Sequence, residues 1–492
     1  MNALLICNVG GRDVSHPDRP KNLHSERQWA QTALAQYPEL CDTFRLPIIR
    51  KALHYLATRH VILDQVILIA SDQPPPPVGN AQFWSSDTIY SAQIIARLLC
   101  DGLTPYPRLN EQQIEIWTIQ TEDGQGCDPS DYDLTLRFLE RQLAELRRVY
   151  PHHTAFFEVT GGTPAMTTGL LIAGTETFGG QTEILSVHPY QELPIALNTG
   201  KRLLATPLRA SLRSHAASYA YDAAARTFRE HKSIITDRLE PTAARLIASL
   251  LAYAHHRFNF DFASARDALQ RVGDAGPWQA ELDSLLAQVN QLALAPVDQL
   301  VRQCRLAELV HGAAARYQIG LYADFLTQVV RFEENLLRYL CIQQRAQFLD
   351  RQQQIDPDGT YLARKWLRQQ KFTLSRDRDP KRDLIVDRSV MQELLAHLFD
   401  QAQPDQRNLL MAIDRLGKLV KRRNRLTHHL EGVQKADLAR DFAGPQAPPA
   451  AADQIVPHLE QLYEQVCRQP LPPSPYQHIN QLLDRLLQAT QT

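Results

Sequence analysis

The stretch ALLICNVGGRD, Ala3 to Asp13, decides the fold class of the first half of this 492-residue chain. Its first five residues form a short apolar run, typical of a buried strand in a parallel sheet, and a polar turn with paired glycines follows. Similar apolar runs recur before residue 200, at 61–70, 114–119, 155–159 and 183–187. Between runs, segments such as 87–100 and 131–150 carry apolar residues at helical spacing. The alternation predicts a doubly wound α/β domain with a mostly parallel sheet.

The second part of the chain shows a different pattern. From about Thr206 onward the strand signal is lost, and only the helical period remains. The segment 324–340 aligns one apolar side chain per turn on a single helix face, which predicts a core helix. The members of that stripe are Phe325, Val329, Phe332, Leu336 and Leu340.

Composition limits the classes of protein that the chain can belong to. Apolar residues make up 44% and charged residues 22% of the sequence, which is typical of a globular protein, and the length favours two or three domains. The formal net charge of -1 means that any nucleic-acid contact must come from a local patch. The seven cysteines form no CxxC pair, so we expect no zinc knuckle and a reducing, cytoplasmic environment. We expect no signal peptide and no membrane segment.

Three polar loops follow predicted strands, where parallel sheets bind their ligands. Arg12, in the first loop, is suited to bind a phosphate, while Thr163 and Pro164 suit the N-cap and first position of a helix. The exposed N–H groups of such turns bind anions or nucleotides. The candidate ligand-binding residues are Asn8, Gly10, Gly11, Arg12, Asp13, Ser71, Asp72, Gly161, Gly162, Thr163 and Met166.

Known nucleotide fingerprints are missing from these loops. GGRDVS is not GxGxxG, and GGTPAMT lacks the Gly-Lys-Ser/Thr of a phosphate-binding loop, so a dehydrogenase or P-loop NTPase is disfavoured. Any single loop can also need its glycines merely to reverse the chain. Three polar loops above one sheet favour a nucleotide sensor.

The stretch KRRNRLTHHLEG, 421–432, is the second informative motif. Arg423 precedes His428 by five residues, a spacing that alone means little because Arg19 and His24 share it. Asn424 and His428 lie four apart on one helix face, whereas Arg423 lies about 140° round the helix from His428. For them to converge, either the last turn unwinds toward Gly432 or two copies of the stretch face each other.

A histidine and an arginine that meet at one phosphate suffice for metal-free RNA cleavage. The imidazole moves a proton, the guanidinium stabilises phosphoryl charge, and the ribose 2′-hydroxyl is the nucleophile, so DNA would not be cut. Lys421, Arg422 and Arg425 are suited to assist phosphate binding. The alternative is a basic helix end that complements the helix dipole.

These motifs together resemble the accessory ribonucleases of type III CRISPR systems, which join an N-terminal CARF sensor domain to a C-terminal HEPN nuclease domain. Arg423, Asn424 and His428 match the Arg-Asn-x-x-x-His motif of HEPN domains, and they are the candidate catalytic residues. ALLICNVGGRD and the TGGTPAM turn at 160–166 resemble the CARF half. The resemblance covers the full chain.

The resemblance implies a domain plan and a function. It implies a Rossmann-like CARF domain at 1–205, a helical linker domain at 206–315 and an all-α HEPN domain at 316–492. In such a homodimer, a cyclic tetra- or hexa-adenylate ring activates nonspecific cleavage of single-stranded RNA, which leaves 2′,3′-cyclic phosphate ends. It implies no cofactor, no metal, no membrane and no stable association with the effector complex.

Two other classes stay open at this point. One is a ligand-controlled nucleic-acid-binding regulator that has a CARF sensor but no nuclease activity. The other is an α/β nucleotide hydrolase with a helical cap. His429 also doubles the candidate histidine, so the motif position alone assigns the role to His428.

Overall fold

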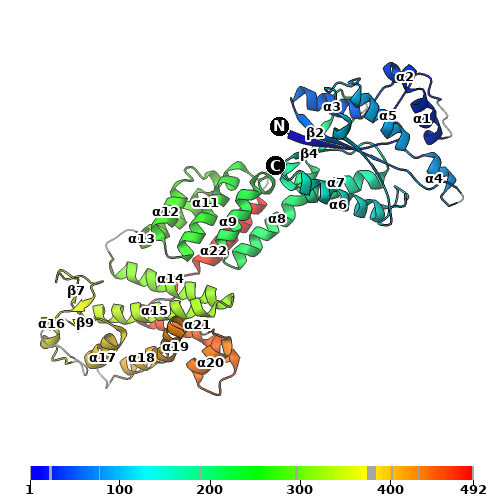
Figure 1. Ribbon diagram of the computed structural model, residues 1–492. Helices are drawn as coiled ribbons and strands as arrows, with labels where there is room; N and C mark the ends of the chain where they lie inside the picture. Colours follow the sequence, from blue (N-terminus) through cyan, green and yellow to red (C-terminus); the bar gives the residue numbers. More distant parts are fainter. Residues whose placement is uncertain are drawn as a thin grey trace. The chain divides into compact units, whose positions relative to one another are not determined.

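The computed structural model describes residues 2–20, 25–76, 78–188, 190–293, 297–373, 384–399, 403–429 and 432–489, with the backbone alone for 427–429. The chain divides into two compact units (Figure 1). Unit 1 comprises 1–211 and 227–238, and unit 2 comprises 212–226 and 239–492. The predicted domain boundaries at 205 and 315 stay predictions.

Unit 1 is built on a six-stranded sheet of order β3-β2-β1-β4-β5-β6, in which only β6 is antiparallel. The predicted α/β class with a mostly parallel sheet is confirmed, and the five expected strands are present within one or two residues. The short edge strand β6 was not predicted. The strands are β1 (Asn2–Asn8), β2 (Ile62–Ala70), β3 (Ile114–Thr118), β4 (Thr154–Glu158), β5 (Thr182–Ser186) and β6 (Ile195–Leu197).

Helices cover both faces of this sheet, which explains why its strands are apolar on both sides. Alternate residues of β1 enter two different cores: Leu5 packs with α1, α3 and α5, and Leu4 packs with α6 and α7 (Figure 1). The unit 1 helices are α1 (Glu26–Ala35), α2 (Tyr37–Leu40), α3 (Ile49–Thr58), α4 (Ala81–Ser85), α5 (Ile89–Cys100), α6 (Tyr132–Val149), α7 (Pro164–Phe178) and α10 (Lys232–Ile235), while α8 (Thr199–Ala217) and α9 (Tyr221–Glu230) contribute to both units.

The strand order places a topological switch point between β1 and β4. From β1 the chain proceeds to β2 and β3 on one side, and then crosses to β4 and β5 on the other. The crossover helices of the two halves therefore lie on opposite faces. A crevice beyond the carboxyl ends of β1 and β4 follows from this arrangement.

Unit 2 is almost entirely helical, as predicted. The apolar stripe of α15 is confirmed as core, since Phe325, Val329, Phe332 and Leu336 are fully buried. The unit 2 helices are α11 (Pro241–Phe258), α12 (Phe262–Gln270), α13 (Gln279–Ala293), α14 (Gln299–Gln318), α15 (Tyr322–Gln343), α16 (Arg364–Gln369), α17 (Arg388–Leu398), α18 (Pro404–Asp414), α19 (Gly417–His429), α20 (Lys435–Ala443), α21 (Ile455–Cys467) and α22 (Pro475–Gln488).

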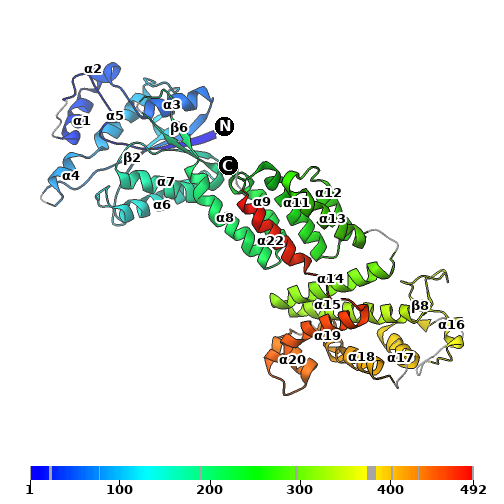
Figure 2. The same cartoon turned by 180° about the vertical axis from the view of Figure 1, so that it is seen from behind.

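Two features of unit 2 were not predicted. Three two-residue strands pair in the order β7-β8-β9, at Phe348–Leu349, Tyr361–Leu362 and Leu384–Ile385. They are too short to show a period in the sequence. The C-terminal helix α22 returns to pack beside α11, as the two opposite views agree (Figures 1 and 2).

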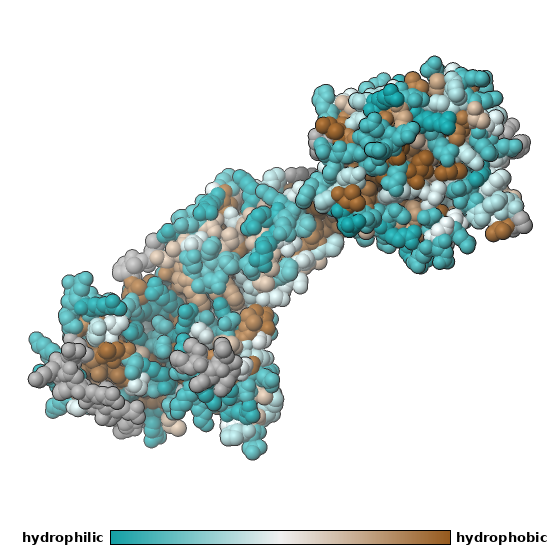
Figure 3. Space-filling model, in the orientation of Figure 1, coloured by the Kyte–Doolittle hydropathy of each residue, from teal (hydrophilic) through white to brown (hydrophobic). Residues whose placement is uncertain are grey.

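The surface is typical of a protein in contact with water. Hydrophilic residues predominate over both units on the face that Figure 3 shows. Across the described ranges, the structure contains no helix long and apolar enough to span a bilayer.

Candidate functional site

A cavity of about 330 Å³ lies in unit 1 at the carboxyl ends of the strands. The turns after β1 and β4 form one side of it, at the switch point, and the loop after β2 with α4 contributes another. Its lining residues are Gly10, Gly11, Ser71, Gln73, Gln82, Phe83, Ser86, Thr88, Asp128, Pro129, Ser130, Gly162, Thr163 and Met166. The cavity therefore brings all three predicted loops together.

The glycines of the first and third loops allow two backbone turns to touch. A Cβ atom on Gly10 would lie 2.8 Å from the Gly162 nitrogen, and one on Gly161 would lie 2.5 Å from the Asn8 carbonyl oxygen. Gly162 also has a φ of +82°, a conformation that L side chains rarely adopt. These contacts fix the shape of the cavity floor.

Two buried carboxyl groups lie behind this contact. Asp13 accepts a hydrogen bond of 2.6 Å from the Gly10 N–H, and Glu158 accepts one of 2.8 Å from the Thr160 N–H. Burial, together with the neighbouring Glu158 and Glu26 charges, raises the pKa of Asp13 to about 7, although the Gly10 hydrogen bond opposes the shift. Burial also raises the pKa of Glu158. Burial therefore favours the protonated, uncharged form of both carboxyl groups beneath the turns.

Asn8 is buried at the end of β1 with 2% of its surface exposed. Neither its amide oxygen nor its amide nitrogen has a hydrogen-bond partner among the described residues. An amide without a partner at this depth is unusual, and it marks Asn8 as a polar group next to the two glycine turns.

The third loop starts α7 as predicted. The Thr163 hydroxyl accepts a hydrogen bond of 3.2 Å from the Met166 N–H, and Pro164 occupies the first turn. The same hydroxyl donates to the carbonyl oxygen of Pro129. Thr163 therefore joins the glycine turn to the 128–130 loop, which lines the same cavity.

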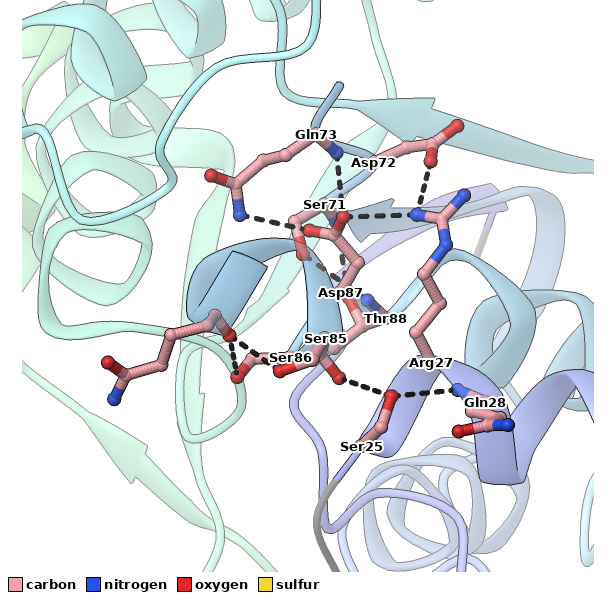
Figure 4. Close-up of polar contacts among 11 residues, drawn as sticks. Ser25, Arg27, Gln28, Ser71, Asp72, Gln73, Ser85, Ser86, Asp87 and Thr88 are labelled. Carbon is pink, nitrogen blue, oxygen red and sulfur yellow. Dashed lines mark hydrogen bonds and ion pairs between the residues drawn. The ribbon is translucent and has the colours of Figure 1, made fainter. Parts of the chain in front are cut away.

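A hydrogen-bonded network supports the wall formed by the loop after β2 (Figure 4). Arg27 of α1 donates to Asp72 at 2.6 Å and to the fully buried Asp87 at 3.0 Å. Asp87 also accepts from the backbone N–H of Gln73 at 2.8 Å and from its side-chain amide at 3.1 Å. Ser71 and Thr88 exchange two hydrogen bonds, each from a backbone N–H to a hydroxyl. The wall is held from α1 through to the start of α5.

The predicted ligand-binding residues divide into two groups. Lining the cavity are Gly10, Gly11, Ser71, Gly162, Thr163 and Met166. Of the others, Asn8, Asp13 and Gly161 support the turns, Arg12 is exposed, and Asp72 is paired with Arg27.

Sequence reasoning missed the opposite wall. Phe83 of α4 and the 128–130 loop reach the cavity from segments that carry no nucleotide-binding pattern. Asp87 was also missed, because its role depends on the approach of α1, sixty residues earlier. The Asn80 cap of α4 and the Asp131 cap of α6 were the available signals of helix starts near the site.

The second candidate site lies on α19 in unit 2. This helix is continuous from Gly417 to His429, so the last turn does not unwind between Arg423 and His428. Arg423 donates a hydrogen bond of 3.2 Å to the Asn424 amide oxygen. The side chain of His428 lies outside the described part of the structure.

The neighbouring cations of α19 have different surroundings. Lys421 and Arg425 are exposed and stay candidates for phosphate binding. Arg422 pairs with Asp441 and Asp437 of α20. The suggestion that Arg422 assists phosphate binding is therefore replaced by a role in joining α19 to α20.

A buried ion pair positions the start of α19. Glu333 of α15 is fully buried and accepts two hydrogen bonds from Arg388 of α17, at 2.8 and 2.7 Å. A Cβ atom on Gly417 would lie 2.9 Å from the same guanidinium. The sequence pattern left Glu333 outside the apolar stripe and did not predict its partner.

No cluster of three potential metal ligands from His, Cys, Asp and Glu occurs within the described ranges.

Of the comparisons with known proteins, the one with solved structures identifies the fold. No protein-family model and no curated protein sequence matches the chain. Among solved structures, Enterococcus italicus Csm6 bound to cyclic hexa-2'-fluoro-hexa-dAMP matches with a TM-score of 0.58 over 99% of both chains, at 14% identity. The chain therefore has the fold of this Csm6 along its whole length, an α/β unit followed by a helical remainder.

Proposed function

We propose that this chain is an endoribonuclease of type III CRISPR antiviral defence that a cyclic oligoadenylate activates. The observation that carries the proposal is Arg423, Asn424 and His428 on one continuous helix of a chain with the fold of Csm6. The cavity at the switch point of unit 1 supports a sensor role, since the matched Csm6 structure contains a cyclic hexa-adenylate analogue.

The proposed sensor site binds the ring through the turns after β1 and β4. Gly10, Gly11 and Gly162 present backbone groups without side chains, so phosphates and ribose can approach closely. Thr163 and Pro164 begin α7, whose N-terminal N–H groups favour an anion. The unsatisfied amide of Asn8 supplies a further polar group behind the turns.

The proposed cleavage uses the substrate's own nucleophile. The ribose 2′-oxygen bonds to phosphorus and its proton passes to the His428 imidazole of one copy, while the bond from phosphorus to the 5′-oxygen breaks and that oxygen takes a proton from the protonated His428 of the other copy. The products are a 2′,3′-cyclic phosphate and a 5′-hydroxyl. Arg423 stabilises the charge that develops on the phosphoryl oxygens, and Asn424 orients a neighbouring side chain. None of these steps uses a metal ion.

The proposed enzyme is a homodimer in the cytoplasm that acts without stable association with the effector complex. On one helix, Arg423 and His428 lie about 140° apart, so one copy alone presents them to different sides. Two copies of α19 facing each other place a guanidinium and an imidazole on both sides of one groove.

A panel of activators tests this proposal. Labelled single-stranded RNA is incubated with the protein and EDTA, together with cyclic tri-, tetra- or hexa-adenylate in separate reactions. We expect shortening of the RNA with the tetra- or hexa-adenylate ring only, and no cleavage of a matched DNA. RNA that binds in a gel-shift assay without shortening would replace the nuclease by a nucleic-acid-binding regulator.

A further inference from the structure

We infer that Gln73 selects the base of the ring, because this cavity-lining residue turns its amide oxygen away from Asp87 as a fixed hydrogen-bond acceptor for the exocyclic amino group of adenine. This inference rests on the proposed sensor function and adds the group that reads the base. Gln73 is one of the cavity-lining residues and is 8% exposed.

The orientation of the Gln73 amide follows from its partner. A carboxylate only accepts hydrogen bonds, so the nitrogen of the amide must face Asp87 and the oxygen must face away. The distance from Gln73 Nε2 to Asp87 Oδ1 is 3.1 Å. Figure 4 shows the amide oxygen of Gln73 turned away from Asp87.

Asp87 is itself held in place by hydrogen-bond donors on both carboxyl oxygens. It is fully buried, and its second oxygen accepts from Arg27 at 3.0 Å and from the Gln73 backbone N–H at 2.8 Å. The Arg27 guanidinium is held in turn by Asp72 at 2.6 Å and lies over the rings of Trp84 and Tyr90. Rotation of the amide would place the Gln73 oxygen against the carboxylate, which costs a hydrogen bond and adds repulsion.

The amide oxygen of Gln73 has no hydrogen-bond partner among the described residues, and it is not sealed from solvent. A base with an exocyclic amino group donates to it, whereas the 6-keto oxygen of hypoxanthine meets it as a second acceptor. Phe83, 41% exposed on the same cavity, offers an apolar surface to a base. The pair is thus suited to an adenine and is mismatched to inosine.

Calorimetric titration of the wild-type chain with cyclic hexa-adenylate, cyclic tetra-adenylate and the corresponding inosine rings tests this assignment. We expect the adenine ring to bind roughly 3- to 10-fold more tightly than its inosine counterpart for each base that Gln73 contacts. This arm needs no variant, so it holds whatever a substitution does to folding. Equal affinity for the two kinds of ring overturns the inference and leaves the sensor role intact.

Variants then assign the preference to Gln73. Gln73→Ala should lose affinity for the adenine ring by roughly 3- to 10-fold, with affinity for the inosine ring unchanged or raised. Asp87→Asn lets residue 87 donate to the Gln73 oxygen and should also reduce the preference. Gln28→Ala is the matched control, because its side chain is exposed on α1 and does not line the cavity. An unchanged adenine-to-inosine ratio in Gln73→Ala overturns the inference, whereas no binding of any ring to the wild type overturns the sensor proposal itself.

Discussion

At the scale of single residues, the glycine turns of unit 1 are built on contact distances that no side chain permits. Gly161 has room for hydrogen alone, since a Cβ atom would lie 2.5 Å from both the Asn8 carbonyl oxygen and an Asp13 carboxyl oxygen. Backbone and buried atoms of this kind cannot move aside easily. The close contact of the two turns at the cavity floor therefore requires glycine at position 161.

Gly161→Ala should lower the free energy of unfolding by about 1–3 kcal/mol, because the added methyl group forces the two turns apart. Chemical denaturation measures the change. Gly11→Ala is the matched control on the neighbouring turn, where a Cβ atom would lie 3.5 Å from its nearest neighbour and make ordinary contact. Equal stability of the two variants would contradict the packing that we describe.

Asp13, beneath the same turns, should make the stability of the fold depend on pH. Its pKa rises from the ordinary 3.8 to about 7 in the folded chain, mainly because the group is buried. Between those pH values the carboxyl group is protonated in the folded state and ionised in the unfolded state. Its contribution to the free energy of unfolding is therefore fully present below pH 3.8 and is lost as pH rises through about 7.

Asp13→Asn cannot ionise, so it should lack this fall in the free energy of unfolding with rising pH, which amounts to at most about 1.4 kcal/mol per pH unit. The stability of the variant relative to the wild type should therefore rise as pH increases through the window. Denaturation curves at several pH values measure it, with the exposed Asp123→Asn as control. A difference between Asp13→Asn and the wild type that does not vary with pH would show that Asp13 ionises normally.

At the scale of elements, two ion pairs hold the candidate catalytic helix α19, one packed against its start and one near its middle. Arg422 joins it to α20, and the Glu333–Arg388 pair fixes α15 and α17 against its first residue, Gly417. These contacts come from α15 and α17, which lie earlier in the sequence, and from α20, the next helix along the chain. The orientation of Arg423 and Asn424 follows from them.

Arg388→Met should lower the free energy of unfolding by roughly 3 kcal/mol, because it leaves the buried Glu333 without a partner. The double variant Glu333→Leu with Arg388→Met should regain most of that loss, since both charges are then removed together. Arg226→Met is the control, because its pair with Asp222 is exposed and such pairs contribute about 0–1 kcal/mol. A double variant no more stable than Arg388→Met would contradict the pairing.

Sequence periodicity predicted the elements well where a pattern extends over several residues. The buried strands β1 to β5 are continuous apolar runs and were found within one or two residues, and the helical period of 324–340 identified the buried face of α15. The strands β7 to β9 have two residues each and show no period.

The candidate site was predicted only in part. Gly10, Gly162 and Thr163 carry local turn and cap signals, and they do line the cavity. Gln73 lies in the predicted loop after β2, but its role, like those of Phe83 and Asp87, depends on tertiary contacts for which one sequence holds no local signal.

At the scale of the whole molecule, the proposed nuclease site requires two copies of the chain. A continuous α19 separates Arg423 from His428 by about 140°, and in the proposed homodimer a second copy would supply the other side of the groove. The chain shares the fold of this Csm6 over its full length.

Mixed assemblies test the shared groove. Wild-type and His428→Ala chains are unfolded together, refolded at equal ratio and assayed for activator-dependent RNA cleavage. If both copies are needed, activity should fall to about a quarter of the wild-type value, the fraction of dimers with two intact chains. Independent sites would leave about half, and that result would contradict the shared groove.

The most direct test of the central claim compares two adjacent histidines. Wild type, His428→Ala and His429→Ala are each incubated with labelled RNA, cyclic hexa- or tetra-adenylate and EDTA, after binding of the ring has been confirmed for all three. The account predicts cleavage by the wild type and by His429→Ala, and a loss of at least about 100-fold for His428→Ala, the range for removal of a general acid or base. Cleavage by His428→Ala at the wild-type rate would contradict it.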